Sequence, residues 1–478
     1  MTSIPTIPDQ AQPSRRMGIL LLLIVAIIDA AFMPLQIWPG DAQVWRLETR
    51  TFLQAGHLWI DPRIVASTVG EPGQYYDYNP ADGQSYSKYG IANSLMAIPP
   101  VAAQLLISGN GPISLRTSAL ILNFWNLLLC LLLAAVLYRI TRRYSPKPAR
   151  RAFFVLACLF GTFLWYYQRA QGSEIYQLIF FALAYEFLLR GFERPRWFWL
   201  AWLFVALLLL TRVFFGILIP IFAAFIVGSA IAGRRPLRRI LMPLLIPPVA
   251  MILLLGWINN LKFGSPWLTG YHQWRPEEHL LTGSWLDGVY GLLFSGHWSV
   301  FTYFPVLLIA LPGMKKFTEE HRPDFLLILT TFVATLLVLG KIPSWRGEWS
   351  YGPRYMLFLL PIVSLPALTV DFGRARVWAF VAAAGLLFSL WLQIEVNRVD
   401  FWFFYQVQQP LDRLMDKETA QYFYDHQEGI IIHDLESHRR DLDGAFLFRH
   451  LRGQLPPERM EQYRDRVIRE LDFSNFYW

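Results

Sequence analysis

The sequence predicts an all-α polytopic membrane protein, and its composition and the grouping of its apolar residues support this fold class. Hydrophobic residues make up 54% of the 478 residues, and charged residues make up only 16%. Soluble globular chains carry about 25% charged residues. The apolar residues also fall in long blocks rather than at the spacing of one helix face, which is typical of helices that cross a bilayer.

The first predicted span covers residues 18–38. A helix needs about 20 residues to cross about 30 Å of hydrocarbon, and this block is long enough. It lacks a small-residue cleavage site and follows a polar tail that ends in two arginines, so we interpret it as a retained span rather than a removed signal peptide. Both cysteines lie inside apolar blocks, so the sequence predicts neither a disulfide framework nor a thiolate metal site.

Charge bias sets the topology of the later apolar blocks. If residues 88–108 crossed the membrane, the basic loop 139–151 would lie outside. If they form an interfacial or re-entrant helix, five basic loops lie inside, as the positive-inside rule requires. We therefore predict about eleven spans, with the N-terminus inside and the C-terminus outside. The spans after the first are 116–139, 152–168, 174–189, 197–211, 213–231, 240–257, 300–314, 325–340, 353–370 and 377–396.

Residues 196–231 must form two spans. One helix over this stretch would extend about 54 Å, which is far longer than the hydrocarbon is thick. Arg212 falls near the midpoint, in the predicted tight turn. A charge in such a turn is costly without an anionic partner, so Arg212 is a candidate functional residue.

The predicted topology gathers the polar residues on the outer side. Residues 1–396 form a transmembrane domain whose first outer loop covers 39–115, and residues 397–478 form a small extracytoplasmic segment of soluble composition. In the first outer loop, two tyrosine-rich stretches around residues 79–83 predict a β-hairpin. The net charge of +8 arises mostly from the short basic loops, so it indicates topology and not binding of nucleic acid.

Acidic residues follow the first span. If the segment is helical, Asp41 and Glu48 fall on nearly the same face. Arg46 and Arg50 flank Glu48 and can satisfy its charge, whereas Asp41 has no cation close by in the sequence. An ordinary solvated helix end is the alternative interpretation of this segment.

Two more candidates stand at the start of predicted helices. Lys88 opens the interfacial helix, where a lysine can also serve as a membrane anchor. Glu174 opens a later span, where an acid also suits the positive end of the helix dipole. Both residues therefore admit a structural interpretation as well as a functional one.

Two outer loops combine polar and aromatic residues. Tyr271 and His272 offer stacking and hydrogen-bonding groups, although aromatic residues also form belts at membrane interfaces. Glu348 and Arg354 lie together beside the start of the apolar block 353–370.

Several motifs occur together in a fixed order. An Asp after the first span and an acid at the start of a later span accompany the segments "SKYGIANSLMAIPP", "LLTR", "NNLKFGSPWLTGY" and "GPRYMLFLLPI". Together they resemble the GT-C superfamily of polyprenyl-phosphate-sugar glycosyltransferases, particularly bacterial relatives of protein O-mannosyltransferases and of the lipid A aminoarabinose transferase. The resemblance covers residues 18–370 and implies a GT-C-like transmembrane bundle in a bacterial inner membrane, with its active site on the extracytoplasmic face.

The resemblance also implies roles for individual residues. Asp41 takes the place of the catalytic acid–base residue and Glu174 that of a second carboxylate, while Lys88 and Arg212, with Arg354 as a third cation, are expected on the donor phosphate. The residues expected to bind substrate are Tyr89, Tyr271, His272 and Glu348. Many relatives have Asp-Glu where this chain has Asp41-Ala42. We therefore predict no metal ligands, and a divalent cation stays open.

The chemistry of such a transfer suits these residue types. A lipid phosphate leaves as a weak base, so it needs cations rather than a protonating acid. The acceptor must lose a proton, which requires one carboxylate opposite the leaving group, as in single-step inversion. The expected partners are a polyprenyl-phosphate-linked sugar, an extracytoplasmic glycan, lipid or protein acceptor, and membrane lipids. The alternative is a transporter or flippase of lipid-linked sugars, since charged residues that face a membrane cavity also mark substrate pathways.

Overall fold

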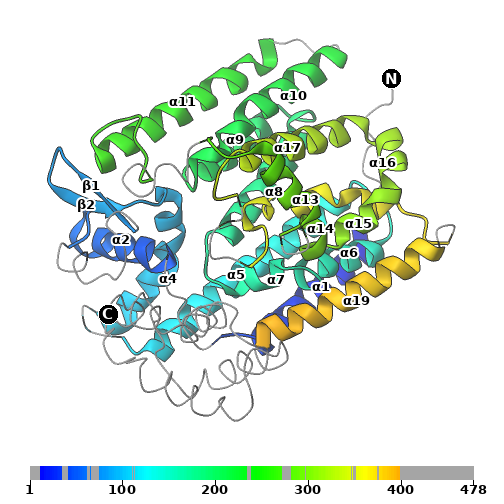
Figure 1. The fold of residues 1–478 in the computed structure, drawn as a ribbon, viewed down its shortest axis with the longest axis horizontal. Coiled ribbons are helices and arrows are strands. Elements are labelled where there is room, and N and C mark those ends of the chain that lie inside the picture. The colour runs from blue at the N-terminus through cyan, green and yellow to red at the C-terminus, as the bar shows by residue number, and fades with distance from the viewer. Residues whose placement is uncertain are drawn as a thin grey trace.

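A computed structural model gives the protein an all-helical membrane fold with one small β-hairpin (Figure 1). The structure describes residues 11–34, 41–61, 65, 75–109, 111, 113–233, 238–271, 281–295, 298–345, 347, 351–373 and 376–398. The predicted C-terminal segment 397–478 lies almost wholly outside the described residues.

Most of the first half of the chain forms helices, and α2 begins directly at Asp41. They are α1 (Ala11–Ala31), α2 (Asp41–Ala55), α4 (Ile91–Ser108), α5 (Leu115–Thr141), α6 (Pro148–Phe160), α7 (Leu164–Arg169), α8 (Glu174–Gly191), α9 (Arg196–Leu209), η1 (Val213–Ile217), α10 (Leu218–Ala232) and α11 (Arg238–Phe263). The later elements include several short helices. They are α13 (Trp285–Phe294), α14 (Val300–Tyr303), α15 (Val306–Ala310), η2 (Leu311–Gly313), α16 (Met314–Glu320), α17 (Arg322–Gly340), η3 (Arg354–Met356), α18 (Leu360–Val363), η4 (Leu365–Thr369) and α19 (Arg376–Arg398).

Six helices within the described residues are long and apolar enough to cross a membrane. They lie in α4, α5, α10 with η1, α11, α17 and α19. The predicted count of about eleven spans also included shorter apolar helices such as α9, and it stays a prediction. The statement that residues 88–108 do not cross the membrane also stays a prediction, because α4 meets the length and hydropathy needed for a span.

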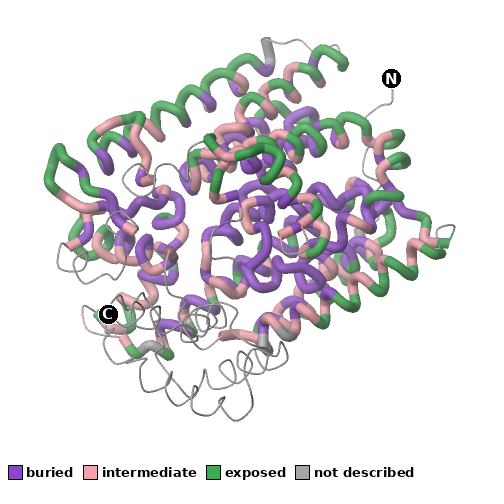
Figure 2. Tube along the Cα trace, in the orientation of Figure 1, coloured by how far each residue is buried: buried purple, intermediate pink, exposed green. Residues whose placement is uncertain are grey.

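The core surrounds α8, whose residues are buried on nearly every side. Figure 2 shows this interior in purple, while α10, α11 and α19 expose long stretches at the periphery. The exposed side chains there are apolar, for example Met242, Leu253 and Phe380. A helix that is hydrophobic all round belongs in a core, and helices with an exposed apolar face fit a lipid environment.

Two local predictions are confirmed. Strands β1 (Tyr76–Asn79) and β2 (Gln84–Ser87) pair antiparallel around the expected turn. Residues 196–231 form two helices, and Arg212 lies in the turn between α9 and η1 with an extended backbone.

Other apolar blocks were wrongly predicted as continuous helices. Block 152–168 breaks between α6 and α7, where the Thr162 hydroxyl donates to the Cys158 carbonyl. Blocks 300–314 and 353–370 break into short helices that contain or adjoin prolines such as Pro305 and Pro361, and proline removes a backbone N–H from a helix. The first helix, α1, ends at Ala31 rather than near residue 38, shortly before Pro34.

Candidate active site

Glu174 and two arginines form the first part of the site. Glu174 begins α8 and is buried. Its Oε1 lies 3.9 Å from Nη2 of Arg212 and 3.8 Å from Nη1 of Arg354. These distances allow electrostatic attraction but exceed hydrogen-bond length, so both guanidinium groups keep N–H donors for another anion. Nε of Arg354 is buried and has no hydrogen-bond partner among the described residues.

Tyr355 lies against both guanidinium groups. The Cζ of Arg212 is 4.6 Å from the centre of its ring, and the Cζ of Arg354 is 5.3 Å away. Tyr355, Glu174 and Asp41 all lie within electrostatic reach of Arg354. Both arginines therefore stay charged at any pH at which the protein works.

Asp41 and Tyr89 form the second part. Asp41 is the first residue of α2, and its Oδ1 accepts a hydrogen bond from the Tyr89 hydroxyl. Burial raises the pKa of Tyr89 well above its usual value, and the Asp41 carboxylate raises it further. Since Asp41 also lies within electrostatic reach of Arg354, the two parts of the site share one electrostatic environment.

Lys88 supplies a third cation. It is buried, and its Nζ lies 5.2 Å from the centre of the Tyr89 ring and 5.1 Å from that of Tyr271. A cation between two aromatic faces is attracted by the ring quadrupoles. Tyr271 in turn contributes to the pKa of Arg212, which places these tyrosines within the electrostatic reach of that arginine as well.

Two glycines allow the segments of the site to approach one another. A Cβ on Gly90 would lie 2.1 Å from the Leu210 carbonyl oxygen, in the turn that leads to Arg212. A Cβ on Gly270 would lie 2.2 Å from the Lys88 carbonyl oxygen. Backbone contacts this close require glycine. The loop after β2 therefore packs directly against the two segments that carry Arg212 and Tyr271.

The structure thus brings together most of the predicted site residues. They are Asp41, Lys88, Tyr89, Glu174, Arg212, Tyr271 and Arg354, and each is linked to at least one other by a contact or electrostatic interaction. His272 and Glu348 lie outside the described residues.

The structure gives Glu48 a partner other than the two arginines that could satisfy its charge. Glu48 does not pair with Arg46 or Arg50. It forms an ion pair with Lys262, at 2.7 Å between Nζ and Oε1. Arg46 instead donates to Gln171 and Arg50 to Gln54. Arg46 and Arg50 are near Glu48 only in sequence, whereas α11 brings Lys262 against α2 in the fold.

Sequence reasoning also missed three polar residues around the site. Tyr355 follows Arg354 directly, and this position next to a candidate cation could have identified it as a site residue. Lys262 ends an apolar helix and has the appearance of an ordinary anchor. Gln171 is the one non-glycine residue with positive φ, at 52°, in the part of the chain that the structure describes. It bonds to Arg46 and Asn123, contacts that no local pattern encodes.

Metal binding has limited support from the side chains present. Within the described ranges, no three His, Cys, Asp or Glu residues gather in a group that could hold a metal ion. The Glu174 carboxylate faces two guanidinium groups, and Asp41 accepts from Tyr89.

Comparison with known proteins finds likeness at the level of fold. No family model matches the chain, and no curated protein matches it in sequence. The chain is similar to the crystal structure of ArnT from Cupriavidus metallidurans bound to undecaprenyl phosphate, with a TM-score of 0.52 and 16% identity over 91% of this chain and 76% of that chain. It also matches the apo oligosaccharyltransferase of Archaeoglobus fulgidus, with a TM-score of 0.47 and 13% identity over 86% of this chain and 59% of that chain. The likeness to ArnT is one of fold, and it supports the all-helical membrane fold that the sequence predicts.

Proposed function

We propose that the protein is a membrane glycosyltransferase that moves a sugar from a polyprenyl-phosphate donor to an extracytoplasmic acceptor with inversion at the anomeric carbon. The observation that carries this proposal is the convergence of Lys88, Arg212 and Arg354 on a small, partly exposed region that also holds the Asp41 carboxylate. The likeness to ArnT, which was solved with undecaprenyl phosphate, supports a lipid phosphate as the ligand of these cations.

The charge of the site suits this donor. Three cations and two carboxylates leave one formal positive charge. A sugar joined to a lipid monophosphate is a phosphodiester with one negative charge, so its binding neutralises the site. When the bond to the sugar breaks, the departing polyprenyl phosphate gains a second negative charge. Buried cations stabilise that developing charge in the transition state more than they stabilise the bound donor.

Arg212 and Arg354 are suited to bind the phosphate oxygens. A guanidinium group can form two parallel hydrogen bonds to a phosphate, whereas the Lys88 ammonium acts as a point charge. Glu174 holds both arginines at ion-pair distance before the donor arrives. It therefore organises the two cations without occupying their hydrogen-bond donors.

Asp41 is the general base in this mechanism. It takes the proton from the acceptor hydroxyl or amine as that group attacks the anomeric carbon, and the lipid phosphate leaves from the opposite face of the sugar. The hydrogen bond from Tyr89 orients the carboxylate and leaves its second oxygen available for the acceptor. Such orientation of a base is a requirement of efficient proton transfer.

The test is a direct assay of transfer. Purified protein is incubated with a panel of polyprenyl-phosphate sugars and with membrane extracts as the acceptor source, and release of free polyprenyl phosphate is measured. We expect release with at least one donor and none with the Asp41→Asn variant. Movement of intact donor across vesicles without release of polyprenyl phosphate would contradict the proposal and favour a flippase.

A further inference from the structure

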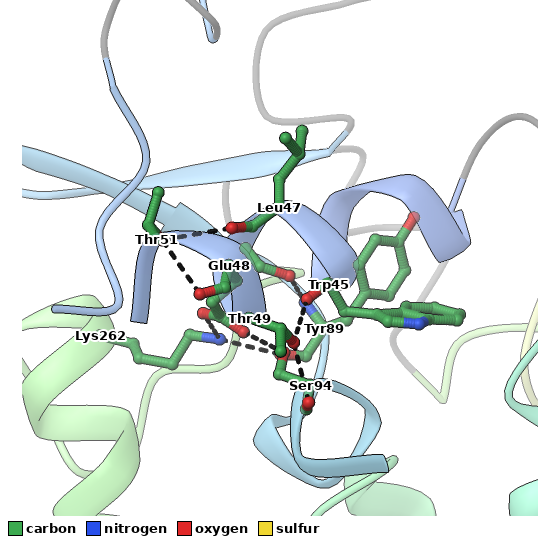
Figure 3. A network of polar contacts seen from close by, with 9 residues as sticks. Trp45, Leu47, Glu48, Thr49, Thr51, Tyr89, Ser94 and Lys262 are labelled. Carbon is green, nitrogen blue, oxygen red and sulfur yellow. Dashed lines mark hydrogen bonds and ion pairs between the residues drawn. The ribbon is translucent and has the colours of Figure 1, made fainter. Parts of the chain in front are cut away.

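A buried ion pair lies next to the candidate site. Lys262, in the last turn of α11, pairs with Glu48 of α2, and the two side chains are 1% and 0% exposed (Figure 3). Neither residue belongs to the group assigned above to the donor or to the acceptor. The pair therefore needs an explanation of its own.

Lys262 also holds the backbone of the site. Its Nζ donates to the Tyr89 carbonyl at 3.0 Å. The hydroxyl of that same tyrosine donates to Asp41, and the preceding residue is Lys88. The Lys262 ammonium thus holds the residue that orients the predicted base, Asp41. The same residue, Tyr89, directly follows Lys88, a predicted phosphate ligand.

Glu48 completes the network from the other side. Its Oε2 accepts a hydrogen bond from Ser94 of α4 at 2.5 Å. The Ser94 carbonyl accepts from Thr49, which follows Glu48 in α2, at 2.8 Å. Figure 3 shows these contacts converging between α2, α4 and α11. The network joins three helices around Tyr89, so none of them can shift without breaking a buried polar contact.

Stability alone is a poor explanation for the pair. Removing two charges from water is costly, and replacing a buried ion pair with apolar residues is often neutral or stabilising. The better attested use of such a pair is to specify one arrangement among several. Here the arrangement it specifies is that of Tyr89 relative to α2, whose first residue is Asp41.

We propose that Lys262 and Glu48 are positioning residues of the transfer reaction, which fix the Tyr89 backbone so that its hydroxyl orients the Asp41 carboxylate. This inference rests on the proposed function. It assigns to the pair an effect on the chemical step that is transmitted through Tyr89 rather than through contact with substrate.

The proposal predicts coupling between Lys262 and Tyr89. Lys262→Met keeps most of the length of the side chain and removes its charge and its hydrogen bonds. We expect kcat to fall by about 10- to 100-fold, because a small misplacement of a catalytic group can cost about 10²-fold. In the Tyr89→Phe background, Lys262→Met should cause little further loss, since the tyrosine through which it acts is already without its hydroxyl. Non-additivity of this kind identifies residues that act through one another.

Arg143→Met provides the matched control. Arg143 and the buried Asp324 form another ion pair, at 2.8 Å between Nε and Oδ2, in a network with Tyr144 and Tyr185 that is separate from the site. This variant should lower the thermal stability as the Lys262 variant does. Its kcat should stay near that of the wild type, and any effect should be independent of Tyr89.

Three outcomes decide the matter. Loss of kcat in Lys262→Met that disappears in the Tyr89→Phe background supports the proposal. Equal losses in both backgrounds, or a wild-type kcat in Lys262→Met, overturn it. If Lys262→Met does not fold, Ser94→Ala removes the hydrogen bond to Glu48 and is measured in the same cycle, with additive losses overturning the proposal. An inactive wild type instead contradicts the proposed function, and the Asp41→Asn comparison separates that failure from this one.

Discussion

The Tyr89 hydroxyl donates a hydrogen bond to the Asp41 carboxylate, although 48 residues separate the two in the chain. The contact links the start of α2 to the loop that leaves the β-hairpin. In Figure 1 these elements lie together at one end of the molecule, beside α4. A carboxylate held in this way has a defined orientation, which a general base needs and a solvated helix end does not.

Asp41→Asn should abolish transfer. The amide is nearly isosteric with the carboxylate, but it cannot accept the proton of the acceptor. Loss of a general base typically lowers the rate by about 10²–10⁴-fold. We expect donor binding and expression to stay close to the wild type, and kcat of detergent-purified protein is the measurement. Wild-type turnover in this variant would remove Asp41 from the mechanism.

Tyr89→Phe should lower kcat. A hydrogen bond to a charged group contributes about 1.5–3 kcal/mol, and 1.4 kcal/mol corresponds to about tenfold in rate. Because this bond orients the Asp41 carboxylate, its loss should lower kcat of the purified protein, which is the measurement.

The wild-type protein should show no basic limb from Tyr89 below pH 10. Burial and Asp41 raise the pKa of this tyrosine above its ordinary value of 10.0, so its hydroxyl keeps its proton. The raised pKa of Tyr89 also makes the stability of the protein depend on pH. The contribution of Tyr89 to the free energy of unfolding is fully present below about pH 10 and is lost as the pH rises toward the folded-state pKa. A loss of activity near pH 8 that Tyr89→Phe abolishes would contradict this assignment.

Arg212→Ala should weaken donor binding and slow the chemical step. In the proposed mechanism the guanidinium contacts the phosphate in both the bound donor and the transition state, where the charge is larger. Removal of one such group costs about 10²–10³ in kcat in comparable sites. Arg212→Lys should recover only part of the activity, because an ammonium cannot form the paired hydrogen bonds.

A matched control for Arg212→Ala is Arg190→Ala. Arg190 also pairs with a buried glutamate, Glu186, but in the last turn of α8, whereas Glu174 is its first residue. This variant should bind polyprenyl phosphate as the wild type does. If Arg212→Ala and Lys88→Ala bind it equally well, these cations serve the fold or the topology and not the donor.

Cysteine labelling tests the predicted topology. Ala81, at the tip of the hairpin, and Ala149, at the start of α6, are both exposed, whereas the native cysteines are buried. Ala81→Cys should react with a membrane-impermeant reagent from the outside, and Ala149→Cys should react only after the membrane is permeabilised. The reverse pattern would place the site on the cytoplasmic face.

The sequence was most informative where local chemistry dictates the structure. The turn at residues 79–83 and the charge of Arg212 between two apolar helices were both recognisable, and the structure has the hairpin and the helix break there. The candidate site residues could be proposed because their order resembles a known pattern. Their spatial convergence depends on tertiary packing that no local signal specifies.

The failures have physical causes as well. The pairing of Lys262 with Glu48 depends on how α11 packs beside α2, whereas neighbouring arginines in the sequence suggested a different partner. The broken helices were predicted as continuous because hydropathy is insensitive to backbone hydrogen bonding. A break such as the one at Thr162 occurs where tertiary contacts and side-chain hydrogen bonds replace the helical ones.

Gly90→Ala should separate the two halves of the site. The added Cβ would lie 2.1 Å from the Leu210 carbonyl oxygen and 2.7 Å from that of Thr211, so the loop that carries Lys88 must move away from the turn that carries Arg212. Overpacking costs about 1–3 kcal/mol of stability, and here the movement also pulls apart the cations expected on one phosphate. We therefore expect a lower Tm together with a raised KM for the donor. Gly228→Ala is the control, because a Cβ there meets no atom within 4 Å; it should leave the donor KM unchanged and should not lower the Tm, since alanine favours the interior of α10. A Gly90→Ala protein that lost stability but kept the wild-type donor KM would show that Lys88 and Arg212 do not need their close approach to bind the donor.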